Sequence, residues 1–262
     1  MSTSIGQVSQ EVVGHVLQIG LNRVDKRNAF DSHMILALSQ ALTAYEEDSN
    51  LRCAVIFAHG EHFTAGLDLM QLQSKISAGI FDFSEHEIHP WGTGGRRRTK
   101  PIVVAVQGTC YTAGVELMLN ADVVIASEDA VFGQLEVQRG IMPFGGATVR
   151  FVQAAGWQKA MPYLLTGKTF DSQTAERLNL VSEVVAKGEQ LQRANEIANE
   201  IAHAAPLAVQ ALIASATDAV LDGQEAAFAK LNGYLPPLFQ SQDAQEGVMA
   251  MLQKRPAQFQ GR

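Results

Sequence analysis

Three short runs of apolar residues place the strongest limits on how this chain can fold. They cover residues 53–58, 102–106 and 122–126, and stretches with helical spacing separate them. Runs this short and this rich in β-branched residues are typical of strands that are buried on both faces of a parallel sheet. Because such strands alternate with helices along the chain, the sequence predicts an α/β fold.

Before these runs, the sequence has the features of a strand pair followed by a helix. Residues 11–21 alternate between apolar and polar side chains, with Gly14 at the position of a turn. Asp31 stands directly before residues 32–45, which have helical spacing. An aspartate at this position caps the free N–H groups of a first helical turn, so we expect two paired strands and then a capped helix.

After these runs, the sequence becomes helical. From Gln190 onward nearly all of it has helical spacing, with breaks expected at Gly223 and at Pro236–Pro237. No sequence repeat and no long linker divides the chain into independent domains. We therefore expect a core over residues 1–189 and a helical C-terminal region over residues 190–262.

The composition indicates a large core and disfavours nucleic acid as a partner. The chain has 262 residues, of which 47% are hydrophobic, and this is enough to bury a substantial core. Its net charge of −7 disfavours binding to a phosphate backbone, which favours basic surfaces. The N-terminal residues lack a charged and apolar leader, and no run approaches the ~18 apolar residues of a membrane span. We therefore expect a cytoplasmic protein that does not contact a membrane.

The cysteines and histidines predict neither a disulfide nor a metal site. Cys53 and Cys110 lie within or beside apolar runs, where a cysteine is a small buried hydrophobic residue of a reducing compartment. His86 and His89 are three residues apart and precede a proline, a spacing that lacks the third ligand of zinc helices. We expect free thiols and no bound metal.

Residues 76–99 interrupt the periodic pattern. They contain Pro90 and several glycines, which favours either a mobile segment beside a substrate entrance or an ordinary variable loop. The segment ends in a basic cluster, Arg96–Arg98, with Lys100 just beyond it. This cluster is either a solvated surface or a patch that attracts the phosphates of a ligand.

Two glutamates, Glu116 and Glu136, are the strongest candidates for chemistry. Glu116 follows a turn of small residues that begins at Gly108, and a similar turn lies over residues 63–69. Small residues let a backbone approach a ligand closely, and the first N–H groups of a helix have no partner inside it. Donors from two such turns can hold one developing oxyanion between them, while the carboxylates transfer protons.

These segments resemble motifs of the crotonase superfamily, which contains enoyl-CoA hydratases and isomerases. Phe63–Leu69 resembles the motif F-x-A-G-x-D-L, and Gly108–Leu117 resembles G-x-x-x-G-G-G-x-E-L. Phe132–Glu136 resembles F-G-Q-P-E, and Asn28–Phe30 resembles an early N-A-L/F motif. The order and spacing hold over residues 13–185, so the resemblance covers nearly the whole chain.

The resemblance implies a fold, an assembly and an activity. The fold is a crotonase-like spiral of ββα units, and its helical C-terminal region builds homotrimers or hexamers. The activity is hydration of a 2-enoyl-CoA thioester, with coenzyme A carried as part of the substrate and no separate cofactor. Two alternatives stay open: an enoyl-CoA double-bond isomerase that relies on one glutamate, and a catalytically weak protein that binds acyl-CoA.

The resemblance also implies roles for individual residues. Ala65 and Ala113 donate backbone N–H groups to the thioester oxygen, while Glu116 and Glu136 activate water and exchange the proton beside the carbonyl. Basic residues before Asn28 either face the phosphates of coenzyme A or form a solvated charge run. The residues expected to bind substrate are Arg23, Lys26, Arg27, Ala29, Gly66, Leu67, Asp68, Leu69, Tyr111, Gly114 and Phe144.

The sequence departs from the family pattern at three places. Thr112–Gly114 reads Thr-Ala-Gly where the family has three glycines, so the methyl group of Ala113 is tolerable only at a negative φ. Leu135 stands where proline is common, and Phe144 stands where glycine is usual. An aromatic ring at that last position narrows or reshapes the acyl pocket.

Overall fold

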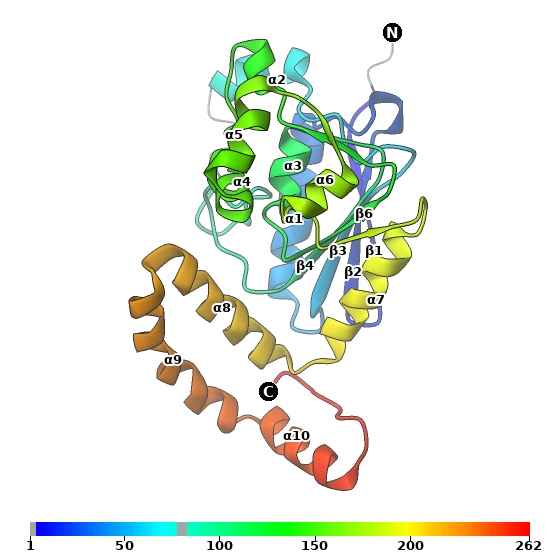
Figure 1. Cartoon of the computed structure of the whole chain (residues 1–262). Helices are drawn as coiled ribbons and strands as arrows, with labels where there is room; N and C mark the ends of the chain where they lie inside the picture. Colours follow the sequence, from blue (N-terminus) through cyan, green and yellow to red (C-terminus); the bar gives the residue numbers. More distant parts are fainter. Residues whose placement is uncertain (1–3, 78–82) are drawn as a thin grey trace.

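A six-stranded sheet forms the centre of the molecule (Figure 1). The structure is a computed structural model that describes residues 4–77 and 83–262. Strands β1 and β2 pair antiparallel, and the later pairings in this sheet are parallel. In sheet order the strands are β1 (Gln7–Val13), β2 (Val16–Asn22), β3 (Cys53–Ala58), β4 (Ile102–Val106), β6 (Val123–Ser127) and β9 (Glu183–Val185).

A second, smaller sheet has three strands. It joins the short strands β5 (Thr109–Tyr111), β7 (Val131–Gly133) and β8 (Phe170–Asp171). β4 continues into β5 and helix α3 (Ala113–Met118), and β6 continues into β7 and the 3-10 helix η2 (Glu136–Arg139). Each of these units adds one strand to each sheet before a helical segment follows. The predicted α/β fold of ββα units is therefore confirmed.

Helices cover the sheet and make up the C-terminal region. Asp31 caps the first long helix as predicted, because its Oδ1 accepts a 2.8 Å hydrogen bond from the Met34 N–H. This helix is α1 (Ser32–Glu47). The remaining helical segments are η1 (Val24–Lys26), α2 (Leu69–Ser77), α4 (Ala147–Ala155), α5 (Trp157–Thr166), α6 (Ser172–Arg177), α7 (Gln190–His203), α8 (Pro206–Asp222), α9 (Gln224–Phe239) and α10 (Gln242–Gln253).

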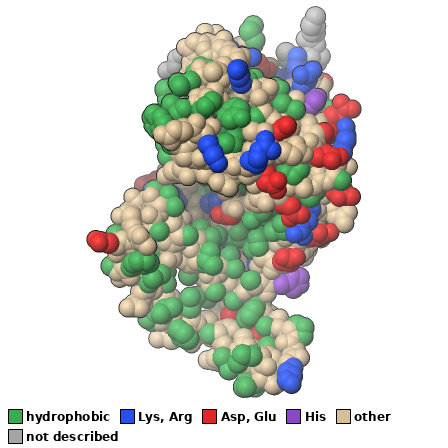
Figure 2. Space-filling view, in the orientation of Figure 1, with side chains coloured by type: hydrophobic (Ala, Val, Ile, Leu, Met, Phe, Trp, Pro, Cys, Tyr) green, Lys and Arg blue, Asp and Glu red, His purple; other side chains and the backbone are tan. Residues whose placement is uncertain are grey.

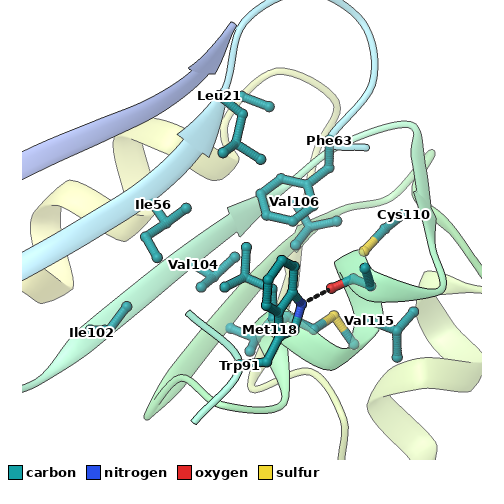
Figure 3. Packing of buried hydrophobic residues seen from close by; sticks show 14 of the residues in the cluster. Leu21, Ile56, Phe63, Trp91, Ile102, Val104, Val106, Cys110, Val115 and Met118 are labelled. Carbon is teal, nitrogen blue, oxygen red and sulfur yellow. Dashed lines mark hydrogen bonds between the residues drawn. The ribbon is translucent and has the colours of Figure 1, made fainter. Parts of the chain in front are cut away.

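Strands β3, β4 and β6 of the large sheet are buried on both faces, which is why they are continuous apolar runs. On one face, Ile56 and Val104 pack in the main core with Trp91 (Figure 3). On the other face, Val103 packs in a second cluster with the small side chains of α7, such as Ala198. Alternate residues of each strand therefore fill two different cores, and this fixes the register of the strands.

Helix α7 belongs to the packing of the core although the sequence division placed it in the C-terminal region. Ala194, Ala198 and Ala202 are four residues apart and lie on one buried face of this helix. Small side chains at this spacing let the helix lie close to the sheet. The chain leaves the core only after α7, where α8 begins at Pro206.

The two predicted helix breaks in the C-terminal region had different outcomes. Gly223, with φ at 86°, separates α8 from α9 as expected. Pro236 and Pro237 lie inside α9, so the break predicted there is wrong. The pair falls in the last turn of α9, and the Pro236 carbonyl still accepts the Gln240 N–H at 3.1 Å.

Helices α8–α10 extend away from the sheet and expose much apolar surface (Figures 1 and 2). Phe228 is 60% exposed on α9 and Leu252 is 68% exposed on α10. In the described part of the chain no single helix is long and apolar enough to cross a membrane; α7 and α8 together have the length and composition, but they meet at a bend of 106°.

Candidate active site

A cleft of about 460 Å³ lies between the turn after β3, the start of α3 and the stretch that follows η2. A smaller cavity of about 20 Å³ adjoins it. Leu67, Ala113, Glu116 and Phe144 line both spaces. The two turns and the carboxylates that the sequence singled out are therefore assembled around one hollow in the surface.

Most of the predicted site residues line this cleft. The predicted catalytic residues Ala65, Ala113, Glu116 and Glu136 all do so. Among the predicted substrate-binding residues, the cleft is lined by Lys26, Arg27, Ala29, Leu67, Asp68, Leu69, Tyr111 and Phe144.

Arg23 does not reach the cleft, so its predicted role in substrate binding is wrong. Its side chain is buried, and its Nη1 donates to Asp68 Oδ2 at 2.9 Å and to the Ala29 carbonyl at 3.0 Å. Its Nε lies 3.7 Å from Asp31 Oδ2. A buried guanidinium needs such partners because desolvation of an unpaired charge is costly, so Arg23 stabilises the loop beneath the site.

Gly66 and Gly114 also do not line the cleft, and their predicted substrate contacts are wrong. A Cβ at Gly66 would overlap the Thr112 hydroxyl, and a Cβ at Gly114 would overlap the Thr64 methyl group. Each glycine therefore lets one of the two turns approach the other closely.

The N–H groups of Leu67 and Ala113 are free backbone donors at the cleft. Leu67 forms a parallel bridge with Phe30, in which the Phe30 N–H donates to the Gly66 carbonyl at 2.8 Å and the Asp68 N–H donates to the Phe30 carbonyl at 2.9 Å. The N–H of Leu67 itself takes no part in this bridge and points away from Phe30. Within the described residues, neither the Leu67 N–H nor the Ala113 N–H has a protein acceptor. Two such donors at one cleft can hold an oxyanion between them.

Ala65 does not fit the predicted role of oxyanion donor. Its N–H donates to the Arg27 carbonyl at 2.8 Å and is not available to a ligand. The predicted two-donor site therefore has the Leu67 N–H in place of the Ala65 N–H, two residues further along the same turn.

Thr112 and Ala113 both stand where the family has glycine, and of the two only Thr112 adopts a strained backbone conformation. Ala113 has a negative φ, so its methyl group is tolerated, whereas Thr112 has φ 50° and ψ −113°. That region is strained for a β-branched residue and costs on the order of 1–3 kcal/mol. Packing against Gly66 and a 2.8 Å bond from the Thr112 N–H to the Gly133 carbonyl hold the turn in place.

Glu116 is a buried carboxylate held by backbone donors. Its Oε1 accepts hydrogen bonds from the Gly145 N–H at 2.7 Å and the Ala147 N–H at 3.1 Å. The pKa of Glu116 is raised overall because burial outweighs these two bonds and the nearby charge of Arg150, which lower it. Oε1 is occupied, so Oε2 is the oxygen available to act on a ligand.

Glu136 is the second buried carboxylate of the cleft. Its pKa is raised from 4.5 to about 7, mainly by burial and to a smaller extent by repulsion from Glu116, while a hydrogen bond from its own backbone N–H and the charge of Arg139 oppose the shift. The buried Gln134 amide lies 2.9 Å and 3.0 Å from the two carboxyl oxygens and donates to both when its nitrogen faces them. These two bonds favour the ionised carboxylate, whereas burial favours the protonated form. With a pKa of about 7, Glu136 carries a proton in about half of the molecules near neutral pH, which suits a general acid.

Three exposed basic residues stand at the rim of the cleft: Lys26, Arg27 and Arg139. Arg139 was not predicted from the sequence, although its place three residues after Glu136 puts it on the same turn of η2. Positive charges at a cleft mouth attract anionic groups such as phosphates.

Other residues of the site were also missed from the sequence. The inner cavity is lined by His89, Trp91, Thr93 and Gly145, of which the first three come from the irregular segment 76–99. Trp91 is buried, and its Nε1 donates to the Ala113 carbonyl at 2.7 Å (Figure 3). A tryptophan between Pro90 and Gly92 in this glycine-containing segment was the available signal.

The segment 76–99 is in part a packed wall of the site. Its residues 88–91 are buried, and the Ile88 carbonyl accepts a 2.9 Å bond from Ser39. Residues 78–82 lie outside the described residues, so its predicted mobility stays a prediction.

The basic cluster after this segment does not line the cleft. Arg98 pairs with Asp122 at 2.7 Å, and Lys100 is buried against the carbonyls of Tyr45 and Asp48. These two residues have structural roles, and Arg96 lies 3.6 Å from Glu47.

Cys53 and Cys110 are free and buried. Within the described ranges, no three His, Cys, Asp or Glu side chains lie close enough together to hold a metal ion.

The sequence model of the family described as Enoyl-CoA hydratase/isomerase matches residues 11–262. The chain belongs to this family. Enoyl-CoA hydratase EchA19 of Mycobacterium tuberculosis is 33% identical over 252 residues, which are 95% of this chain and 94% of that protein. The 2,3-dehydroadipyl-CoA hydratase of Escherichia coli is 34% identical over 94% of this chain and 96% of its own length.

Solved structures of the hydratase/isomerase family have the same fold. A protein from Mycobacterium abscessus described as a probable enoyl-CoA hydratase/isomerase superposes with a TM-score of 0.94 at 48% identity, over 97% of this chain and 98% of its own. The enoyl-CoA hydratase of Mycobacterium tuberculosis H37Rv gives 0.89 at 30% identity, over 97% and 99%. The predicted family and fold are confirmed.

The raised pKa of Glu136 predicts that this residue destabilises the protein above neutral pH. Between pH 4.5 and about 7 the Glu136 carboxyl keeps its proton in the folded state but releases it in the unfolded chain. The carboxyl therefore leaves the stability of the folded state unchanged below pH 4.5 and lowers it by the full amount above pH 7. Glu136→Gln should therefore raise the free energy of unfolding at pH 8 by up to about 3 kcal/mol and leave it nearly unchanged at pH 4.5.

Urea unfolding at a series of pH values measures this difference. Glu176→Gln, at an exposed position on α6, is the matched control and should follow the wild-type curve. If the Glu136→Gln curve is parallel to that of the wild type over the whole range, the carboxyl does not have a raised pKa.

Proposed function

We propose that this protein is an enoyl-CoA hydratase, which adds water across the double bond of a 2-enoyl-CoA thioester. The observation that carries the proposal is that two buried carboxylates, Glu116 and Glu136, line the same cleft as the free N–H groups of Leu67 and Ala113. Relatives named as hydratases of CoA thioesters support it.

The two N–H groups stabilise the charge that develops during the reaction. Attack of water on a double bond conjugated to a thioester moves electron density onto the carbonyl oxygen. Donors fixed in advance at that oxygen lower the barrier, and loss of one such donor typically costs about 2.7–4 kcal/mol. Leu67 and Ala113 supply these donors from rigid backbone, so no side chain has to reorganise.

The two carboxylates divide the proton transfers between them. Burial raises the pKa of Glu116, but its two backbone hydrogen bonds favour the ionised form and offset part of this shift, and we assign Glu116 as the base that takes a proton from water. Glu136 keeps its proton near neutral pH and delivers it to the carbon beside the carbonyl. The water oxygen bonds to the next carbon, and proton exchange then restores the starting ionisation states.

The basic rim receives the nucleotide part of the substrate. Lys26, Arg27 and Arg139 are exposed at the mouth of the cleft and attract the phosphates of coenzyme A. Coenzyme A is part of the substrate, and the reaction requires no separate cofactor.

We also propose that α8–α10 associate with other copies of the chain in a homotrimer or hexamer. Large apolar side chains on these helices, such as Phe239 at 75% exposure, support an interface there. Buried free thiols at Cys53 and Cys110 support a reducing compartment, and we place the enzyme in the cytoplasm.

Replacing either carboxylate tests the proposed reaction. Glu116→Gln and Glu136→Gln should each lower kcat for hydration of crotonyl-CoA by about a hundredfold or more, because each removes a proton-transfer group. The dissociation constant of an unreactive acyl-CoA should change much less. Glu176→Gln should keep wild-type kinetics.

The products also separate the proposal from its alternatives. An isomerase would convert 3-enoyl-CoA and tolerate the loss of one glutamate, and a binding protein would bind crotonyl-CoA without turnover. Either result would contradict hydration as the function.

Phe144 should limit the length of the acyl chain. It lines both the cleft and the inner cavity and is 40% exposed, so it is a wall residue and not part of the core. Phe144→Gly should raise kcat/KM for longer enoyl-CoA substrates relative to crotonyl-CoA, in steps of about 1–3 kcal/mol or less per methylene.

A chain-length series measured together with the melting temperature tests this role. Phe144→Leu keeps most of the bulk and should stay close to the wild-type profile. An unchanged profile in a stable Phe144→Gly variant would remove Phe144 from the acyl pocket.

A further inference from the structure

Arg150 lies outside both cavities but binds the loops that form them. It is in the first turns of α4, directly after the loop that binds Glu116. Its Nη1 donates to the Trp91 carbonyl at 2.7 Å and lies 3.4 Å from the Gly145 carbonyl, and its Nη2 donates to the Gly92 carbonyl at 3.1 Å. One guanidinium therefore joins two loops that are more than fifty residues apart in sequence.

Each of these loops holds one half of the candidate site. Trp91 donates its indole N–H to the Ala113 carbonyl at 2.7 Å, so it fixes the peptide that begins α3 beside the Ala113 N–H (Figure 3). Gly145 donates its own N–H to Glu116 at 2.7 Å. The loop at Trp91 thus positions an oxyanion donor, and the loop at Gly145 positions the base.

We propose that Arg150 is a positioning residue that keeps the oxyanion donor and the catalytic carboxylate in register with each other. This inference rests on the proposed function of the cleft. The planar fork of a guanidinium can bond several carbonyls at fixed angles, which a lysine ammonium cannot do in the same way. Arg150 lines neither the cleft nor the inner cavity, so it acts on the site through the two loops that it joins.

Besides joining the two loops by hydrogen bonds, Arg150 also acts on Glu116 through its charge. Burial raises the pKa of Glu116, and the backbone donors and Arg150 lower it, so Arg150 helps keep this base ionised. The other titratable groups that face this part of the site are Glu136, with Arg139 beside it, and His89 in the inner cavity; Arg98 faces Arg150 itself. Removal of the Arg150 charge therefore raises the pKa of Glu116.

Two substitutions separate the charge of Arg150 from its geometry. Arg150→Met removes the charge at similar length, and Arg150→Lys keeps the charge but not the fork. Arg150→Met should lower kcat by about tenfold to a hundredfold with little change in KM, and shift the acidic limb of the kcat/KM profile to higher pH. Arg150→Lys should keep the limb at its wild-type position and recover part of kcat.

Matched controls distinguish positioning from general stability. Activities are expressed per folded molecule, and Arg177→Met, at an exposed position on α6, should match the wild type. The inference is overturned if Arg150→Met has the wild-type kcat and pH profile, or if it loses activity only in proportion to unfolded protein.

A titration that needs no turnover separates this inference from the proposed function. The carboxyl band of Glu116 is followed by infrared spectroscopy as the difference between each protein and the same protein carrying Glu116→Gln. Its midpoint should be higher in Arg150→Met than in the wild type even if crotonyl-CoA is not hydrated. Equal midpoints would contradict the role of Arg150, whereas absence of hydration with shifted midpoints would contradict only the hydratase function.

Discussion

The burial of Glu116 is the constraint on which the rest of the site depends. An ionised carboxylate is costly to bury unless hydrogen bonds replace its water, and two backbone N–H groups from the loop at Gly145 do this. That loop must pass close to Glu116, and a Cβ at Gly145 would lie 2.6 Å from Oε2. The position of α4, and of Arg150 within it, follows from this contact.

The oxyanion donors depend on a second close approach, between the turn after β3 and the turn before α3. Gly66 allows Thr112 to pack against it, and Thr112 adopts a strained backbone conformation there. Such strain persists only where the surrounding structure fixes it, and strained residues cluster at functional sites. The parallel bridge between Phe30 and Leu67 completes the arrangement by leaving the Leu67 N–H free at the cleft.

Local patterns in the sequence predicted five of the six strands of the large sheet, the first capped helix and the two glutamates, because each depends on residues close together in the chain. The choice of donor was not predictable in this way. Whether Ala65 or Leu67 has a free N–H depends on pairing with Arg27 and Phe30, more than thirty residues earlier. The burial of Arg23 depends on carboxylates at Asp31 and Asp68, and the role of Trp91 depends on how an irregular loop packs against α3.

The central claim is that the Leu67 and Ala113 N–H groups polarise the carbonyl of a bound thioester. Vibrational spectroscopy of an unreactive enoyl-CoA analogue, labelled with carbon-13 at the thioester carbonyl, measures this polarisation directly. The account predicts that the carbonyl stretch of the bound analogue moves to lower frequency than that of the free analogue. A bound analogue whose carbonyl stretch stays at the frequency of the free ligand would contradict it.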